Sequence, residues 1–291
     1  MAPPRSLRIG TRGSPLALAQ TREVHERLSR AHPQLAEPGA IETRIIRTSG
    51  DKVTDRALAE IGGKGLFTKE IEEALLAFEI DLAVHSMKDV PTWLPPGLEI
   101  VCLLAREDPR DAFFAPGVSA ISGLPEGAKV GTASLRRQAQ ILAQRPDVRV
   151  VTFRGNVQTR LRKLAEGQVD ATVLALAGLK RLGLTDAPAA ILSTEEMLPA
   201  VGQGAIGIEC RSADERVRTL LAALNDEATR IRVTAERALL GALDGSCRTP
   251  IAALAEMEGQ DRLHLRALLA LPDGSKLFRA ERRGPASDAE T

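Results

Sequence analysis

The segment DLAVHSMKDVP, residues 81–91, joins an apolar strand to a charged turn. The run DLAV predicts a strand, and α/β proteins carry out their chemistry where strands end. Pro91 bars regular continuation and biases the preceding residue toward an extended conformation. The segment therefore predicts an α/β fold that fixes Lys88 and Asp89 on a turn at the edge of a sheet. Taken alone, this Lys-Asp pair would be interpreted as a surface ion pair.

A second cluster, rich in arginine, favours a binding role for this region. The motifs Ser134–Arg137 and Phe153–Asn156, followed by Arg160, contain no acidic residue. The planar fork of each guanidinium pairs with a carboxylate through two hydrogen bonds. Several such groups together suit a ligand that carries several carboxylates.

The same order of elements occurs twice along the chain. Residues 7–9 predict a strand that enters a Gly/Thr/Ser turn, followed by a helix that begins at Pro15. Residues 129–130 lead in the same way into the turn at 131–134 and a helix with apolar residues on one face. Each half then has a second helix and an apolar strand that starts at an aspartate. The sequence thus predicts two βαβαβ lobes.

Two α/β lobes in tandem commonly bind a ligand at strand ends and helix N-termini. The turns at 10–14 and 131–134 would present hydroxyl and amide N–H groups, which favour anions. The alternative is that their Ser and Thr residues serve only as N-caps. Two such helix starts in matching positions, each beside arginine, favour binding.

Beyond Pro199 the composition changes and predicts a third domain. Residues 200–210 are punctuated by glycine and predict an extended strand that returns to the first lobe, with hinges at 103–108 and 199–204. A helix ending at Asp244-Gly245 precedes three strands at 251–257, 263–269 and 276–281, with a turn at Pro272–Gly274. The expected domains are a first lobe of residues 1–104 and 200–222, a second lobe of 105–199, and an α+β domain of 223–291.

Composition limits the function classes. The 291 residues carry a net charge of +1, which gives no bulk attraction to nucleic acid or membrane. Aromatic residues make up 2% and Tyr is absent, so stacking platforms for bases are few. The first residues lack an apolar signal region, and no run approaches the ~18 apolar residues of a membrane span, so a cytoplasmic location is expected.

Metal and nucleotide cofactors are not expected. The three cysteines, Cys102, Cys210 and Cys247, have no CxxC spacing, and the four histidines are scattered. Cys102 and Cys210 lie in apolar contexts and are expected to be buried. The segment GGKGLF at 62–67 lacks the spacing of a phosphate-binding P-loop.

Several motifs in order along the chain resemble the porphobilinogen deaminase (hydroxymethylbilane synthase) family. These are HSMKDVP at 85–91, GTASLRRQ at 131–138, RGNVQTRL at 154–161, LPAVGQGAIGIEC at 198–210, and a cysteine in a Gly/Ser loop before TPI at 249–251. The resemblance runs from Leu7 to about Arg283. It implies two lobes like those of type II periplasmic binding proteins and a small α+β C-terminal domain.

The resemblance also implies an activity. Members of the family are transferases that polymerise four porphobilinogen molecules, with loss of ammonia, on a covalent dipyrromethane cofactor. The product is the linear tetrapyrrole hydroxymethylbilane, a precursor of haem. The implied partner is this small-molecule substrate, with no nucleic acid or membrane, and a monomer is expected.

Roles for individual residues follow from the matching motif positions. Cys247 would hold the cofactor through a thioether, and Asp89 would be the catalytic carboxylate. A fixed carboxylate stabilises positive charge that builds on a pyrrole when the amine leaves, and it moves protons. The residues implied to bind cofactor or substrate are Arg12, Ser14, Lys88, Thr132, Ser134, Arg136, Arg137, Arg154, Arg160 and Arg181.

Two departures from the family pattern affect the third domain. Ser246 precedes Cys247 where many members have glycine, and its small side chain should leave attachment intact. The sequence stops at Thr291, short of the helix that usually closes this domain, so a thinner support for Cys247 is expected.

Two other functional classes of protein share part of this sequence pattern. An anion receptor without turnover would share the lobes and arginines, but it would not need Cys247, and a carboxylate such as Asp89 would weaken anion binding. A regulatory ligand sensor would need a DNA-binding module, which the sequence does not contain.

Overall fold

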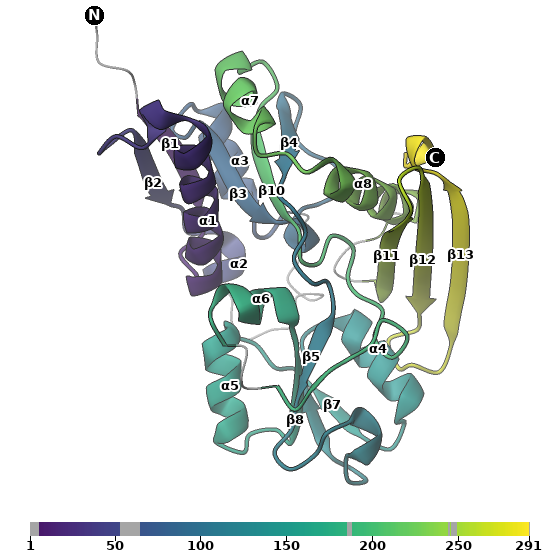
Figure 1. The fold of residues 1–291 in the computed structure, drawn as a ribbon. Helices are drawn as coiled ribbons and strands as arrows, with labels where there is room; N and C mark the ends of the chain where they lie inside the picture. The colour runs from purple at the N-terminus through teal and green to yellow at the C-terminus, as the bar shows by residue number, and fades with distance from the viewer. Residues whose placement is uncertain (1–5, 53–64, 185–187, 244, 246–248, 291) are drawn as a thin grey trace, which may run out of the picture. The chain divides into compact units, whose positions relative to one another are not determined.

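The computed structural model describes residues 6–52, 65–184, 188–243, 245 and 249–290 (Figure 1). The described residues form two compact units. The first comprises residues 6–52, 65–106 and 205–230, and the second comprises residues within 107–204 and 231–290. Among the helices of the described ranges, none has the length and apolar character needed to span a membrane.

The first unit is built on a mixed five-stranded sheet. Its strands are parallel in the first three positions, and β10 then pairs antiparallel with both of its neighbours. The order is β2 (Ile41–Ile45), β1 (Leu7–Thr11), β3 (Leu82–Ser86), β10 (Ile206–Arg211) and β4 (Leu98–Leu103). β3 therefore lies at the centre, and its carboxyl end leads directly into the 3-10 turn Met87–Asp89.

Alternating residues of β3 supply two apolar layers in the first unit. Leu82 and Val84 pack with α1 (Pro15–Ala31) and α7 (Glu215–Ala222) on one face. Ala83 packs with α3 (Lys69–Leu76) on the other face. This period of two is what a strand covered on both faces requires. A short helix, α2 (Ser49–Lys52), follows β2.

The second unit repeats this topology. Its sheet has the order β7 (Arg149–Val151), β6 (Lys129–Gly131), β8 (Ala171–Ala175), β5 (Asp111–Phe114) and β9 (Ala190–Ile191). Here β5 is the strand that runs antiparallel to its neighbours, as β10 does in the first sheet. α4 (Leu135–Gln144) covers one face, and α5 (Val157–Ala165) and α6 (Leu176–Arg181) cover the other.

A three-stranded antiparallel sheet completes the second unit. β11 (Ile251–Glu258), β12 (Arg262–Ala270) and β13 (Leu277–Pro285) follow one another in space, as Figure 1 shows. Ala235, on α8 (Glu227–Ala242), packs against Ala255 and Leu263 of this sheet. Leu254 and Leu268 pack with Ala139 of α4. The sheet is thus attached to the second lobe by its own apolar contacts.

The turn between β12 and β13 also touches α4. Gly274 has a φ of +72° and donates its N–H to Leu271 O at 2.9 Å. A Cβ at this position would lie 2.5 Å from Ala143 N. Only glycine therefore allows this turn to approach the helix so closely.

A buried carboxylate joins three segments of the second unit. Glu236 of α8 accepts a hydrogen bond from Gly202 N at 2.7 Å and another from Ala255 N at 2.9 Å. The Glu236 side chain is fully buried. Each of its oxygens thus accepts a hydrogen bond from a backbone N–H group in a distant part of the chain, as buried polar atoms require.

The predicted fold class is confirmed: two α/β lobes of the periplasmic-binding-protein type II topology and a small C-terminal sheet. One expected strand was wrong in extent. Residues 201–204 form turns, with φ of +68° at Gly202 and +89° at Gly204, and the strand begins only at Ile206. Positive φ at these glycines is incompatible with extended backbone.

Candidate active site

The predicted site residues of the first unit lie at the carboxyl ends of β1 and β3. Arg12 directly follows β1, and Ser14 caps α1 by accepting a hydrogen bond from Ala17 N at 3.3 Å. Lys88 and Asp89 lie on the 3-10 turn after β3. Val90 is extended, with φ of −86° and ψ of 125°, as the following proline predicts. β1 and β3 are adjacent parallel strands, so these residues share one edge of the sheet.

Arg12 and Asp89 approach each other at this edge. Nη1 of Arg12 lies 3.8 Å from Oδ2 of Asp89. The Asp89 side chain is 32% exposed, so solvent and small molecules have access to it. The distance permits charge attraction and exceeds that of a hydrogen bond.

Asp51 also contacts Arg12, and it was not among the residues predicted from the sequence. Its carboxylate accepts hydrogen bonds from Arg12 Nη2 at 2.5 Å and Nε at 3.2 Å. Burial raises the pKa of Asp51, but the interactions with Arg12 and Thr48 lower it by more. The pKa of Asp51 therefore lies below its ordinary value. The only sequence signal was an acidic residue in the segment Thr48-Ser49-Gly50-Asp51.

In the second unit, Thr132 and Ser134 lie at the start of α4. Thr132 is buried, and its hydroxyl accepts a hydrogen bond from Ser134 N at 3.1 Å. Ser134 is the N-cap of α4 and accepts from Arg137 N at 3.4 Å. The capping role considered from the sequence is therefore present here and at Ser14.

Arg136 and Arg137 share a protein carboxylate. Asp111, at the start of β5, accepts from Nη2 of each arginine at 2.8 Å. It also accepts from Gln203 Nε2 at 2.8 Å. Arg136 and Arg137 are each only 5% exposed, and Asp111 is fully buried. An acidic partner for the arginine motif thus comes from a strand 25 residues upstream.

The electrostatics of this triad favour a permanently ionised Asp111. Burial raises the pKa of Asp111, but the two guanidiniums lower it by more, so it lies well below its ordinary value. Two positive charges and one negative charge leave the cluster with net positive charge. Nε of Arg136 is also a buried donor with no hydrogen-bond partner among the described residues.

Arg154, Arg160 and Arg181 are half-buried in the same unit. Arg160 is on α5, and its Nε donates to Gly155 O at 2.8 Å. Arg181 ends α6, and its Nη2 donates to Gly204 O at 3.1 Å. Arg154 O accepts from Lys163 Nζ at 3.3 Å. These contacts hold part of the Arg160 and Arg181 side chains and the backbone of Arg154.

His85, Cys102 and Cys210 are buried in the structure. His85 Nε2 lies 2.8 Å from Oε2 of Glu209, and both side chains are buried. Cys102 and Cys210 are buried, as predicted. Burial raises the pKa of each thiol to about 12, which leaves almost no thiolate at neutral pH. Cys247 and Lys64 lie outside the described residues.

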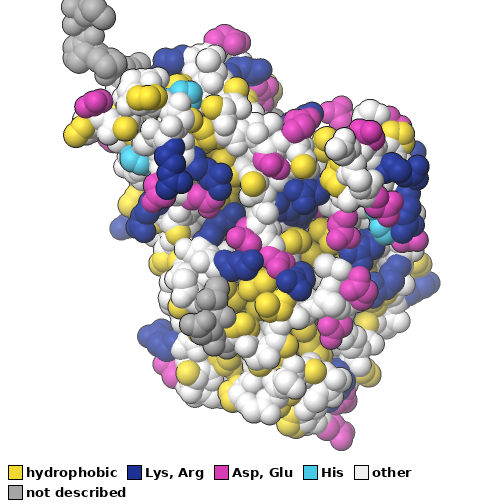
Figure 2. Space-filling model, in the orientation of Figure 1, with side chains coloured by type: hydrophobic (Ala, Val, Ile, Leu, Met, Phe, Trp, Pro, Cys, Tyr) yellow, Lys and Arg dark blue, Asp and Glu magenta, His cyan; other side chains and the backbone are white. Residues whose placement is uncertain are grey.

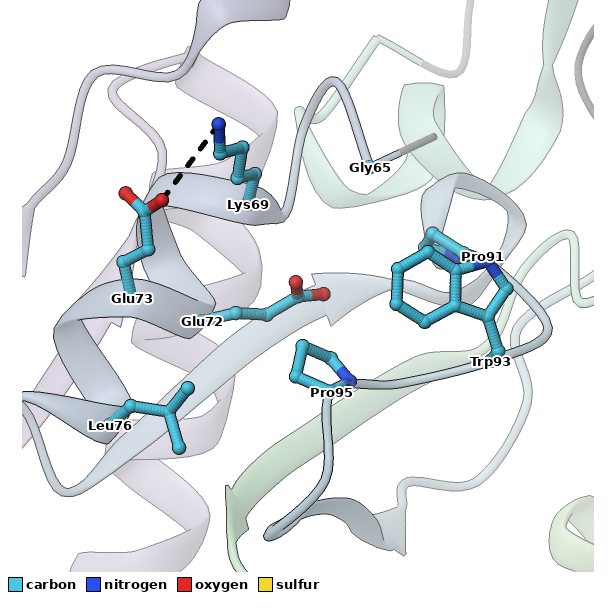
Figure 3. A pocket seen from close by; sticks show the side chains of 8 residues that line it. All are labelled: Gly65, Lys69, Glu72, Glu73, Leu76, Pro91, Trp93 and Pro95. Carbon is cyan, nitrogen blue, oxygen red and sulfur yellow. Dashed lines mark ion pairs between the residues drawn. The ribbon is translucent and has the colours of Figure 1, made fainter. Parts of the chain in front are cut away.

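A pocket of about 240 Å³ has Pro91, two residues after Asp89 in the sequence, in its wall (Figure 3). It is lined by Gly65, Lys69, Glu72, Glu73, Leu76, Pro91, Trp93 and Pro95. Glu72 points toward Pro91 and Trp93, and Lys69 pairs with Glu73 at 3.9 Å. Burial raises the pKa of Glu72, and the Glu209 carboxylate adds to this. With two carboxylates and one cation, this pocket is unsuited to a polycarboxylate.

Charge on the visible surface is mixed. On the face that Figure 2 shows, Lys and Arg side chains are interspersed with Asp and Glu. This agrees with a chain of 39 basic and 38 acidic residues.

The fold and these strand-end residues define a class: an α/β protein with two periplasmic-binding-protein-type lobes and a C-terminal sheet. Comparison with known proteins makes the class specific. Residues 7–219 match the family model of the "porphobilinogen deaminase, dipyromethane cofactor binding domain", and residues 230–291 match that of the "porphobilinogen deaminase, C-terminal domain". The chain belongs to the porphobilinogen deaminase family.

Individual relatives are similar over nearly the whole chain. The chloroplastic porphobilinogen deaminase of Oryza sativa subsp. japonica is 58% identical over 96% of this chain and 78% of its own length. The porphobilinogen deaminase of Paracoccus denitrificans is 58% identical over 98% of this chain and 90% of its own. Among solved structures, the methionine binding protein MetQ aligns with a TM-score of 0.47 and 12% identity, covering 77% of this chain and 92% of that one.

The activity follows from membership of the family. The chain is a transferase of porphyrin and haem biosynthesis, and its substrate is porphobilinogen. It polymerises four substrate molecules, with loss of ammonia, to give the linear tetrapyrrole hydroxymethylbilane. The larger matched domain is the one that binds the dipyrromethane cofactor.

Proposed function

We propose that Asp89 is the catalytic carboxylate of this reaction and that Cys247 holds the dipyrromethane cofactor through a thioether. The observation that carries the first assignment is the position of Asp89 on a turn at a strand end, 3.8 Å from Arg12. A carboxylate there is accessible, ionisable and beside a cation that attracts anionic substrate.

Asp89 has two tasks in this proposal. Each addition joins the aminomethyl carbon of porphobilinogen to a free pyrrole α-carbon and releases ammonia. The carboxylate stabilises the positive charge that develops on the pyrrole as the C–N bond breaks. It also donates the proton with which the amine leaves as ammonia and afterwards takes a proton back from the α-carbon, so that atoms and charge balance.

The basic residues fit a ligand that carries acetate and propionate groups. We assign cofactor and substrate binding to Arg12, Ser14, Lys88, Thr132, Ser134, Arg136, Arg137, Arg154, Arg160 and Arg181. The net positive triad around Asp111 and the unpaired Nε of Arg136 support this assignment for the second unit. The bound cofactor supplies the pyrrole end to which the first substrate is joined.

The case for Cys247 rests on chemistry and on elimination among three cysteines. Cys102 and Cys210 are buried, with each pKa raised to about 12, so neither is suited to form a thioether. Cys247 follows a glycine and serine in sequence and precedes β11 by a few residues. It is therefore the cysteine that we assign to the cofactor.

Intact-mass spectrometry tests the attachment. Purified protein should be heavier than its sequence by the mass of a dipyrromethane, because the thioether survives denaturation. Cys247→Ser should remove this excess, whereas the matched substitution Cys102→Ser should keep it. Protein that accumulates without cofactor should gain the mass on incubation with porphobilinogen. An active wild type with unmodified sequence mass would rule the assignment out.

We further propose that the chain acts as a cytoplasmic monomer, without nucleic acid or membrane. The near-neutral net charge and the mixed surface of Figure 2 support this. The three-domain division at residues 1–104 with 200–222, 105–199 and 223–291 is part of the same proposal.

A further inference from the structure

We propose that Asp51 is a positioning residue for the reaction, which keeps the Arg12 guanidinium beside Asp89 without letting it pair fully with that carboxylate. The inference rests on the proposed function, since it takes Asp89 as the catalytic group. It concerns two carboxylates that share one guanidinium within the first unit.

The guanidinium of Arg12 is held on three sides. Its Nε and Nη2 edge donates to Asp51, at 3.2 Å and 2.5 Å. The Phe67 ring covers one face, with its centroid 4.1 Å from Cζ. Nη1 is then the nitrogen that points to Asp89, at 3.8 Å. The orientation of Arg12 is therefore set by Asp51 and Phe67 before any ligand arrives.

Asp51 is itself fixed by its surroundings. The Thr48 hydroxyl donates to its Oδ2 at 2.8 Å, and Thr48 is fully buried. Gly50 packs so closely on Phe67 that a Cβ would lie 2.3 Å from the ring. Ser49 N donates to Glu70 at 2.8 Å, which connects α2 to α3. Helix α2 thus has the packing and hydrogen bonds needed to hold the Asp51 carboxylate in one place.

The contribution of the Arg12–Asp51 ion pair to folding stability does not by itself explain its presence. The Arg12 and Asp51 side chains are 22% and 28% exposed, and ion pairs open to solvent contribute little to folding. Orientation is the larger effect. A guanidinium released from Asp51 has its full fork available to Asp89 and can form two short hydrogen bonds with it. Asp89 would then be neutralised as a counter-charge and hindered as a proton acceptor.

The test compares kcat and KM of holoenzyme whose cofactor content is verified by intact mass. Asp51→Asn should lower kcat by about tenfold, while KM for porphobilinogen changes less than about threefold. In the Arg12→Gln background, Asp51→Asn should lower kcat by less than about twofold, because there is no guanidinium left to position. Asp51→Glu, which keeps the charge, should retain kcat within about threefold.

Asp214→Asn is the matched control. Asp214 also pairs with an arginine of the first unit, Arg211 at 2.7 Å, and caps α7, a role that asparagine keeps. It should leave kcat unchanged. Should Asp51→Asn fold poorly, Thr48→Val loosens the same carboxylate and should lower kcat only where Arg12 is present.

The outcomes separate this inference from the proposed function. The positioning role would be overturned if Asp51→Asn left kcat unchanged. It would also be overturned if Asp51→Asn lowered kcat equally in the wild-type and Arg12→Gln backgrounds. If Asp89→Ala abolishes turnover in the same assay, the proposed function stands even then. Wild-type turnover by Asp89→Ala would instead remove the premise of both.

Discussion

Asp89→Ala should lower the turnover of porphobilinogen by about 10³-fold or more, while the protein still folds and binds substrate. The side chain is 32% exposed and its nearest charged partner, Arg12, is 3.8 Å away, so little folding energy depends on it. The loss falls on catalysis, because positive charge on the pyrrole has no counter-charge and the α-proton has no acceptor. Steady-state kinetics and substrate binding, measured separately, distinguish the two effects.

Two further variants test whether the loss of turnover depends on the charge and position of Asp89. Asp89→Glu keeps the charge and moves it by one methylene, so it should have a milder defect and accumulate enzyme–substrate adducts visible by mass. Asp147→Ala removes a carboxylate of matching exposure, 33%, that pairs with Arg145 outside the site. It should turn over substrate within about twofold of wild type. Near-wild-type turnover by Asp89→Ala would make Asp89 structural.

Asp111→Ala should lower the stability of the second unit by about 3–5 kcal/mol, or roughly 10 °C in its unfolding midpoint. Removal of this carboxylate leaves the buried guanidiniums of Arg136 and Arg137 without their shared partner. It also leaves Gln203 Nε2 without one of its acceptors. Thermal unfolding followed by circular dichroism measures the shift. Asp147→Ala should shift it far less, because solvent screens that pair.

The effect of Asp111 should depend on pH in a defined direction. Its pKa is lowered in the folded protein, so its contribution is complete above the unfolded value of about 4 and declines as pH falls below that value. The stability difference between wild type and Asp111→Asn should therefore be constant from neutral pH to about pH 5 and narrow below pH 4. A difference that persists unchanged at lower pH would contradict an ionised, ion-paired Asp111.

Local patterns in the sequence predicted the elements that carry the site. Pro15 and the preceding Ser14 fixed the start of α1, and the proline at 91 predicted an extended residue after the turn that bears Asp89. The three C-terminal strands were also predicted, although β13 runs four residues beyond its expected end. Each of these features depends on residues close together in the chain.

Partners that are distant in sequence were not predicted. Asp51 is 39 residues from Arg12, and Asp111 is 25 residues from Arg136. Glu209 reaches His85 across 124 residues, because β10 inserts antiparallel beside β3. Nothing in local composition marks such pairs, since they arise only once the strand order is known. The assigned roles of Asp89 and the binding arginines stay predictions that the experiments above examine.

The carboxylate of Glu236 sets a limit on where this chain can bend. It bonds to backbone N–H groups of both the turn at 201–204 and strand β11, from its place on α8. Displacement of any one of these segments must carry the other two or break a hydrogen bond to this buried side chain. We therefore expect these three segments to move together as the pyrrole chain lengthens. Within the hinge expected at 199–204, we then expect the backbone to bend after Gly204, ahead of the first residue of β10.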